Sequence, residues 1–256
     1  ITTSDFAKIA LIIFTANFIQ NNNKKINDFN VLRKKFIPQF FLTLSLIFFQ
    51  PDLSTTFIIT AIISTMLLIG GLSIKYVIIP GIISFFPIIL NIINTPYQKA
   101  RFIGWISGDL NYQTKHSIEA LGNGGFFGSG IGNSIIKNGY MPEVHTDFIL
   151  PIIGEELGFI GILIVFITFS LIYYFGIKIC KSAPDIFSSM LSFGIIINIL
   201  YYFLINASYV VGIIPTTGLP IPFISYGGSH TLFCLSSIAV LMNISKYTNI
   251  YKYKSL

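Results

Sequence analysis

The sequence predicts an all-α membrane protein, a polytopic bundle of transmembrane helices that forms a single integral membrane domain over residues 1–256. Hydrophobic residues make up 53% of the chain and charged residues only 10%, whereas a soluble domain is about 25% charged. The apolar runs are also long and continuous, while a membrane β-barrel would show alternating strips of about 10 residues. Composition and run length therefore both favour helices packed side by side in lipid.

Seven segments are apolar enough to be spans, each of which needs about 20 residues. They cover residues 5–20, 36–49, 53–70, 76–94, 148–179, 186–211 and 230–245. The second segment has only 14 residues, so it could instead form a broken pair with the third across Gln50, Pro51 and Asp52. The fifth has 32 residues and must tilt or protrude from the bilayer.

Basic residues orient these spans, because Lys and Arg are in excess on the cytoplasmic side of membrane proteins. Eleven of them fall on the side that carries the 21–35 connection and the C-terminal tail, and four fall in one long loop, residues 95–146. We therefore expect this loop and the 215–228 loop to be extracytoplasmic, with the C-terminus in the cytoplasm. The net charge of +6 follows from the same arrangement and indicates no nucleic-acid partner.

The most informative segment is 139–158, which places Asp147, Glu155 and Glu156 at the outer edge of the fifth span. Ionisable groups inside or beside a bilayer usually face a protein interior or a water-filled cavity, and they mark function. Asp147 could instead cap the helix that follows, where it would satisfy backbone amides and the helix dipole. Three acids on the outer half of one helix are too many for capping alone, so we favour a functional site.

Other polar residues near the spans have less specific explanations. A glutamate facing lipid would cost about 2–3 kcal/mol, so we expect Glu156 and residues 158–159 to face the bundle. Lys8, inside the first span, must snorkel to the interface or pair with an acid, for example one of the three above. Arg101 could bind phosphate or contact lipid headgroups, and Asp52 could satisfy backbone groups freed at a helix break.

Two loops have unusual composition. Residues 122–132 contain six glycines, which favours either a backbone that closely approaches a phosphate or sugar ligand or a flexible loop on the membrane. The P-loop signature is missing, so a nucleotide site is not predicted. Residues 215–228 are rich in proline and glycine, and such irregular backbone at membrane depth lines a cavity or packs on protein. Ser225 could donate a hydrogen bond there.

Five motifs follow one another along the chain: SDFAK at 4–8, QPDLST at 50–55, PEVHTDF at 142–148, IGEELG at 153–158 and PTTGLPIPFISYGGS at 215–229. Together they resemble the SEDS family (shape, elongation, division and sporulation), and the glycine-rich loop is closer to its FtsW-like branch than to RodA. The family has ten spans, so the seven predicted here would be its spans four to ten, with three expected before Ile1. The chain departs from the family at Ser54, often glycine, and at His230, usually serine.

The resemblance implies a peptidoglycan glycosyltransferase in the bacterial cytoplasmic membrane, which polymerises lipid II into glycan strands at the outer face during cell division or elongation. The family's proposed catalytic acid corresponds to Asp147, which would be the general base of an inverting displacement. Positive charge must meet the departing pyrophosphate, and Arg101, Lys137 or a divalent cation (Mg²⁺ or Mn²⁺) could supply it. Further substrate-binding candidates are Gln113, Glu143, His145 and Ser225. Candidates that shape the cavity are Lys8, Asp52, Glu155, Glu156, Gly227 and Gly228.

The expected partners are lipid II, the growing glycan strand, membrane lipids and a class B penicillin-binding protein, with which the family pairs. Two other functions stay open, a lipid II flippase and a non-catalytic scaffold for the penicillin-binding protein. A flippase predicts charged residues along a path across the whole bilayer. This sequence concentrates its membrane acids on the outer half, which favours chemistry at the surface.

Overall fold

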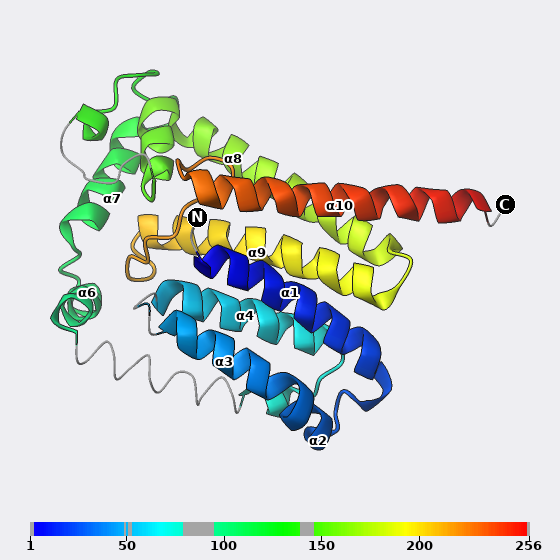
Figure 1. The fold of residues 1–256 in the computed structure, drawn as a ribbon. Coiled ribbons are helices and arrows are strands. Elements are labelled where there is room, and N and C mark those ends of the chain that lie inside the picture. The colour runs from blue at the N-terminus through cyan, green and yellow to red at the C-terminus, as the bar shows by residue number, and fades with distance from the viewer. Residues whose placement is uncertain (1–2, 49, 51–52, 79–94, 139–145, 255–256) are drawn as a thin grey trace. The chain divides into compact units, whose positions relative to one another are not determined.

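The computed structural model describes residues 3–48, 50, 53–78, 95–138 and 146–254, and these residues form helices, turns and loops without a strand. The chain divides into two compact units, whose helices are drawn in Figure 1. The first unit comprises Ile1–Phe86, Ile172–Tyr201 and Gly228–Leu256, and the second comprises Pro87–Leu171 and Tyr202–Gly227. Two helices, α8 (Ile149–Ser182) and α9 (Ile186–Val210), contribute to both units.

The first unit is built from long apolar helices. They are α1 (Thr3–Asn22), α3 (Ile37–Phe48), α4 (Leu53–Ile69), the end of α8, the beginning of α9 and α10 (Gly228–Lys254). Three short elements join α1 to α3: η1 (Asn23–Lys25), α2 (Phe29–Val31) and η2 (Leu32–Phe36). Helix α1 contacts α3, α4 and α10, so it is central to this unit.

Close packing holds the first unit together. Ile12 on α1 and Ile59 and Ile62 on α4 are all at most 2% exposed. A glycine lets α9 come close to them, because a Cβ on Gly194 would lie 2.6 Å from Ile12 Cγ2 and 2.7 Å from Met66 Sδ. Small residues at such interfaces are typical of membrane helices, since lipid offers no hydrophobic drive between helices and close packing must supply the attraction.

The second unit contains the predicted 95–146 loop, and the structure shows two helices there that were not predicted. Helix α6 (Pro96–Ser107) starts with proline and ends at Gly108, whose φ of 75° is left-handed. Helix α7 (Tyr112–Gly124) is capped by Asn111, whose side chain accepts an N–H of the first turn at 2.9 Å. Local capping residues therefore start and end helices within the loop, although its polar sequence did not suggest them.

The remaining parts of the second unit are a short turn, η3 (Ile136–Asn138), the beginning of α8, the end of α9 and the loop between α9 and α10. This loop has no helical residues between 213 and 227. Phe223 adopts a φ of 67°, which is rare for a residue with a side chain. The irregular backbone predicted for 215–228 is thus present up to the start of α10.

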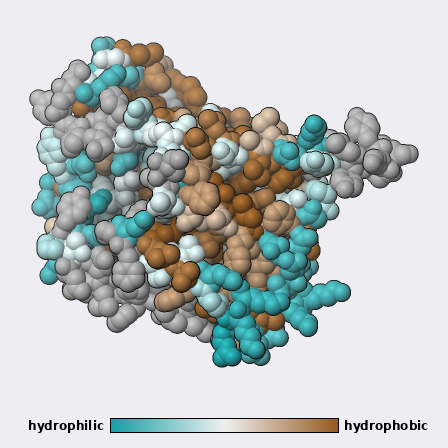
Figure 2. Space-filling view, in the orientation of Figure 1, coloured by the Kyte–Doolittle hydropathy of each residue, from teal (hydrophilic) through white to brown (hydrophobic). Residues whose placement is uncertain are grey.

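The predicted class, an all-α polytopic membrane protein, is confirmed. Helices occupy six of the seven predicted spans, and the other, 76–94, lies largely outside the described residues. By length and composition, three described helices can cross a membrane, Ile149–Ser182, Ile186–Val210 and Gly228–Tyr247, and Leu53–Ile69 is a shorter apolar helix. In the view of Figure 2, hydrophobic surface covers much of the long helices, and hydrophilic surface gathers where α2 lies.

Candidate active site

Asp147 lies in a turn of residues 146–148, immediately before α8, and its side chain is half-buried. The N-terminus of a helix favours a nearby carboxylate, because the helix dipole is positive there. The backbone carbonyl of Asp147 accepts hydrogen bonds from Asn206 Nδ2 at 2.9 Å and from Tyr209 Oη at 2.7 Å. The predicted catalytic acid is therefore partly accessible, and its backbone is tied to the last turns of α9.

The loop between α9 and α10 passes beside this carboxylate. Gly218 has a φ of 69°, and a Cβ at this position would lie 3.2 Å from Asp147 Oδ2. The next carbonyl along, that of Leu219, accepts hydrogen bonds from Asn206 Nδ2 at 2.7 Å and from Tyr209 Oη at 3.1 Å. The same two side chains of α9 thus contact the backbone of the acid and the backbone of the loop that faces it.

Residues of α6, and the residue that caps α7, also donate hydrogen bonds to the segment between α9 and α10. Arg101 donates from Nε to Thr216 Oγ1 at 2.7 Å and from Nη2 to the Thr216 carbonyl. Asn111 Nδ2 donates to Thr216 Oγ1 at 3.0 Å, and Trp105 Nε1 donates to the Gly212 carbonyl at 3.0 Å. The structure thus gives Arg101 a positioning contact, and its predicted contact with phosphate stays a prediction.

Glu155 and Glu156 fasten the segment after the glycine-rich stretch to α8. The carboxylate of Glu155, which is 1% exposed, accepts hydrogen bonds from the Ser134 hydroxyl and from the Ile135 N–H, the second at 3.3 Å. Glu156 Oε1 lies 3.8 Å from Lys137 Nζ, and the Lys137 side chain is 42% exposed. Both acids therefore shape this part of the second unit, while the side chain of Lys137 is partly exposed.

The glycine-rich stretch docks on a break in α8 at Gly158, whose φ is 67°. Four backbone hydrogen bonds join the two: Phe159 N–H to Gly125 C=O at 2.9 Å, Ile160 N–H to Phe126 C=O at 3.4 Å, Ser129 N–H to Glu155 C=O at 2.9 Å and Gly130 N–H to Glu156 C=O at 3.0 Å. The break would otherwise leave these groups unpaired, which is costly in a membrane. Intramolecular docking, which neither predicted role of the loop included, thus explains Gly124 and Gly128, where an added Cβ would lie 1.9 Å from the Gly154 oxygen and 2.1 Å from the Glu156 oxygen of α8.

Two placements differ from expectation. Phe159, predicted to face the bundle, is 53% exposed, because it follows the break at Gly158 and stacks on Phe126 of the glycine-rich stretch, with ring centroids 5.6 Å apart. Lys8 pairs with an acid, which was one of its two predicted alternatives, but the acid is Asp5, at 2.9 Å, which the prediction did not name. Asp5 lies one helical turn earlier, where opposite charges meet readily, and His230 Nδ1 lies 3.8 Å from the same oxygen.

The structure also locates other predicted residues, and their roles stay predictions. Ser225 is buried, and its hydroxyl accepts the Ile221 N–H at 2.8 Å, which closes a turn of the loop. Gln113 is half-buried on α7, and Gly227 and Gly228 stand at the start of α10. Outside the described residues lie Asp52, Glu143 and His145.

A divalent cation stays a prediction. Within the described part of the chain, no three His, Cys, Asp or Glu side chains gather as a metal site would require. Mg²⁺ and Mn²⁺ need several oxygen ligands, and the described surroundings of Asp147 supply no such set.

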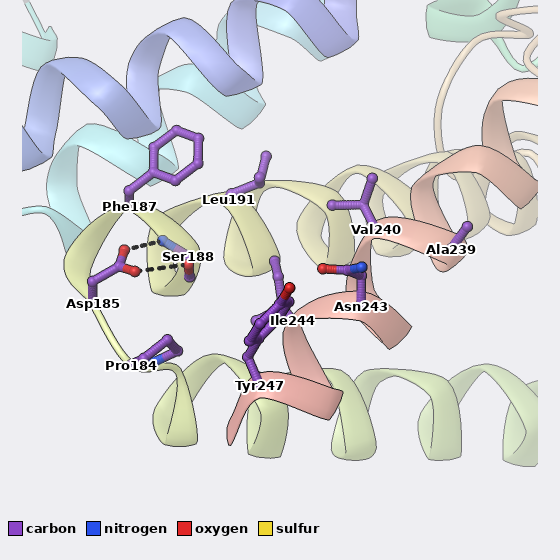
Figure 3. Close-up of a pocket in the computed structure, with 10 residues that line it drawn as sticks. All are labelled: Pro184, Asp185, Phe187, Ser188, Leu191, Ala239, Val240, Asn243, Ile244 and Tyr247. Atoms are coloured by element: carbon purple, nitrogen blue, oxygen red, sulfur yellow. Dashed lines mark hydrogen bonds between the residues drawn. The ribbon is translucent and has the colours of Figure 1, made fainter. Parts of the chain in front are cut away.

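A separate pocket of about 600 Å³ lies in the first unit, between the beginning of α9 and the C-terminal half of α10 (Figure 3). Asp185 lines it, but both carboxylate oxygens of Asp185 accept hydrogen bonds from Ser188, at 2.8 and 3.1 Å, and cap α9. The described lining includes none of the predicted site residues. The pocket therefore adds nothing to the site at Asp147.

Several residues of the site were not found from the sequence. Asn206 carried a usable signal, since it is an amide within the apolar stretch of α9, and polar side chains in membrane helices usually bond to neighbouring elements. Tyr209, Thr216 and Ser134 carried none, because aromatic and hydroxyl side chains are common in such segments. Their contacts depend on how distant segments pack.

Comparison with known proteins places the chain in a family. It matches the family described as "Cell cycle protein" (FtsW/RodA/SpoVE) over residues 1–250. It is 36% identical over 256 residues to stage V sporulation protein E of Bacillus subtilis, which covers 97% of this chain and 69% of the relative. It is 34% identical over 255 residues to a probable peptidoglycan glycosyltransferase FtsW of Taylorella equigenitalis, covering 94% of this chain and 68% of the relative.

Solved structures agree on the fold. One, from work on the structural coordination of polymerization and crosslinking by a peptidoglycan synthase complex, matches with a TM-score of 0.78 at 17% identity, covering 97% of this chain and 70% of the other. The Rod shape determining protein RodA of Thermus thermophilus matches with a TM-score of 0.66 at 17% identity, covering 96% and 66%. With a sequence match along nearly its whole length, the chain belongs to the FtsW/RodA/SpoVE family of cell cycle proteins, as its motifs predicted.

Proposed function

We propose that this chain is a peptidoglycan glycosyltransferase that polymerises lipid II at the outer face of the bacterial cytoplasmic membrane, with Asp147 as its general base. The enzyme class predicted from the sequence agrees with the names of its relatives. The substrate, the membrane face and the role of Asp147 are the new parts of the proposal. The observation that carries them is a half-buried carboxylate at a helix N-terminus, beside a loop whose Gly218 lies close to its Oδ2 atom.

The proposed reaction is a single inverting displacement. A sugar hydroxyl oxygen attacks the anomeric carbon of a lipid-linked sugar and forms the new glycosidic bond. The bond to the lipid pyrophosphate breaks, and the pyrophosphate leaves with the electron pair. Asp147 accepts the proton of the attacking hydroxyl. A well-placed general base contributes about 10²–10⁴-fold to the rate of such a step.

Charge on the leaving group needs a cation nearby. Lys137 suits this role, because its side chain is 42% exposed and its ammonium nitrogen is only loosely paired, at 3.8 Å from Glu156 Oε1. Arg101 is better suited to shaping the site, because its guanidinium group donates to Thr216 in the loop that passes Asp147. We therefore assign the pyrophosphate contact first to Lys137.

A class B penicillin-binding protein is the proposed partner, since a similar structure comes from a peptidoglycan synthase complex. We also propose that the C-terminus is cytoplasmic, which follows from the distribution of Lys and Arg. In this orientation the acids of α8 and the loop beside Asp147 lie at the outer face, where the sugars of lipid II would be.

Polymerisation of labelled lipid II by the purified full-length protein tests the proposal. Asp147→Ala should lower the rate of glycan formation by about 10²-fold or more. Asp109→Ala is the matched control, because Asp109 is an 81% exposed aspartate of the same unit that pairs only across the surface with Lys115, and it should retain the rate of the unchanged protein.

Equal polymer from both variants would refute the role of Asp147. Lipid II transfer across reconstituted vesicles without any polymer would favour the flippase instead. If Asp147→Asn left cell-wall synthesis intact in cells while changes at the partner interface abolished it, the scaffold would be favoured.

A further inference from the structure

We propose that Asn206 and Tyr209 are positioning residues for the glycosyl transfer: together they fix the backbone of Asp147 against the backbone of the loop at Leu219. The inference rests on the proposed role of Asp147 as general base. It concerns residues of α9 that belong to none of the sequence motifs. Three features of the pair support this inference: its contacts, its burial and the number of hydrogen-bond donors that it supplies.

The pair bridges two segments that are distant in the chain. Asn206 Nδ2 lies 2.9 Å from the Asp147 carbonyl and 2.7 Å from the Leu219 carbonyl. Tyr209 Oη lies 2.7 Å from the first carbonyl and 3.1 Å from the second. Both side chains are fully buried, at 0% exposure. Buried side chains in close packing keep one conformation, so the two carbonyls are held at a fixed separation.

Five donor contacts of the cluster share three hydrogens. Asn206 supplies two N–H groups and Tyr209 one O–H group, and the two carbonyl oxygens together offer four lone pairs. Asn206 Nδ2 also lies 2.6 Å from Tyr209 Oη, so the two side chains orient each other. Every hydrogen of the pair therefore has an acceptor, and each carbonyl is reached by both residues.

One atom shows what the arrangement costs. Asn206 Oδ1 is buried and has no hydrogen-bond partner among the described residues. Turning the amide over would direct this oxygen at two carbonyl oxygens, which would repel it, so the orientation is set by the carbonyls. An unsatisfied buried acceptor is unfavourable, and a leucine would fill the position without it. The amide at position 206 is therefore explained by the two carbonyl groups that it donates to, and not by the packing of α9.

The position of the carboxylate follows from these contacts. Leu219 is preceded by Gly218, where a Cβ would lie only 3.2 Å from Asp147 Oδ2. The two side chains therefore set both the backbone that carries the carboxylate and the loop beside it. A reacting group displaced by about 1 Å can lose about 10²-fold in rate, so loss of this contact should lower turnover without unfolding the protein.

The experiment compares four variants of the full-length protein in the lipid II polymerisation assay: Asn206→Leu, Tyr209→Phe, Asn198→Leu and Asp147→Ala. Asn206→Leu should lower kcat about 10- to 100-fold with little change in KM, because the loss affects the transition state alone. Tyr209→Phe should lower kcat by only about two- to tenfold, since Asn206 still reaches both carbonyls. Asn198 is a buried amide on the same helix whose Oδ1 also lacks a hydrogen-bond partner in the described structure, and Asn198→Leu should keep the kcat of the unchanged protein.

Hydrogen exchange provides the structural reading. In Asn206→Leu, peptides that cover residues 146–150 and 217–221 should exchange faster, while peptides from the interior of α8 should not change. Faster exchange throughout the protein would mean general unfolding and would overturn the positioning role. So would an unchanged kcat of Asn206→Leu in a protein that Asp147→Ala inactivates, and then the role of Asp147 would stand alone. If Asp147→Ala stays active, the proposed base and its positioning residues are refuted together.

Discussion

Replacing Gly128 with alanine should undock the glycine-rich stretch from α8. The added Cβ would lie 2.1 Å from the carbonyl oxygen of Glu156 and 2.7 Å from the nitrogen of Gly158, and neither backbone atom can rotate away. Gly128 also has a φ of 82°, where a residue with a side chain is strained by about 1–2 kcal/mol. The stretch must therefore move, and the hydrogen bonds that Ser129 and Gly130 donate to α8 are lost with it.

The magnitude follows from these two contributions. The lost hydrogen bonds are 2.9 and 3.0 Å long, and each contributes about 0.5–1.5 kcal/mol net. Together with the left-handed backbone, Gly128→Ala should cost about 2–5 kcal/mol of unfolding free energy. Gly132 is a matched control, since its φ is 86° but its added Cβ would meet no atom within 4 Å. Gly132→Ala should cost only about 1–2 kcal/mol.

Two separate experiments on the purified protein in detergent measure these effects. Thermal unfolding measures the loss of stability, and limited proteolysis of the folded protein measures the undocking of the glycine-rich stretch. Gly128→Ala should unfold at a lower temperature than Gly132→Ala, and a protease should cut its 125–135 segment faster. Equal stability and equal cleavage of the two variants would show that the close backbone approach to α8 does not require glycine, and the docking argument would be wrong.

Two further predictions concern contacts beside the site. Glu155→Ala should leave two donors unpaired, the buried hydroxyl of Ser134 and the N–H of Ile135. Each unpaired donor should lower the unfolding free energy by about 1–3 kcal/mol. Thermal unfolding in detergent measures this loss, and an unchanged midpoint would contradict the prediction. Arg101→Lys keeps the charge but loses the forked contact with Thr216. It and Thr216→Val should each slow polymerisation, and the double variant should be no slower than the worse single one; additive losses would mean that Arg101 acts elsewhere.

Much of the fold was predictable because membrane insertion depends on local composition. A continuous apolar run needs no distant partner to become a helix in lipid, so α4, α8 and α9 follow the predicted spans closely. The helices of the 95–146 loop were missed although their signals, Pro96 and the cap at Asn111, are local. Their sequences are amphipathic or polar, and hydropathy, which predicts membrane spans, does not detect helix caps.

The sequence by itself determined that this protein is a helical membrane protein, that its acids gather at one end of a span and that its motifs belong to a known family. Only the tertiary structure decided which groups meet. Arg101 and Thr216 are 115 residues apart, and Asp147 and Tyr209 are 62 apart. The physical reason is range: hydropathy and capping act within a few turns of one helix, whereas a contact across such separations exists only when whole helices have packed.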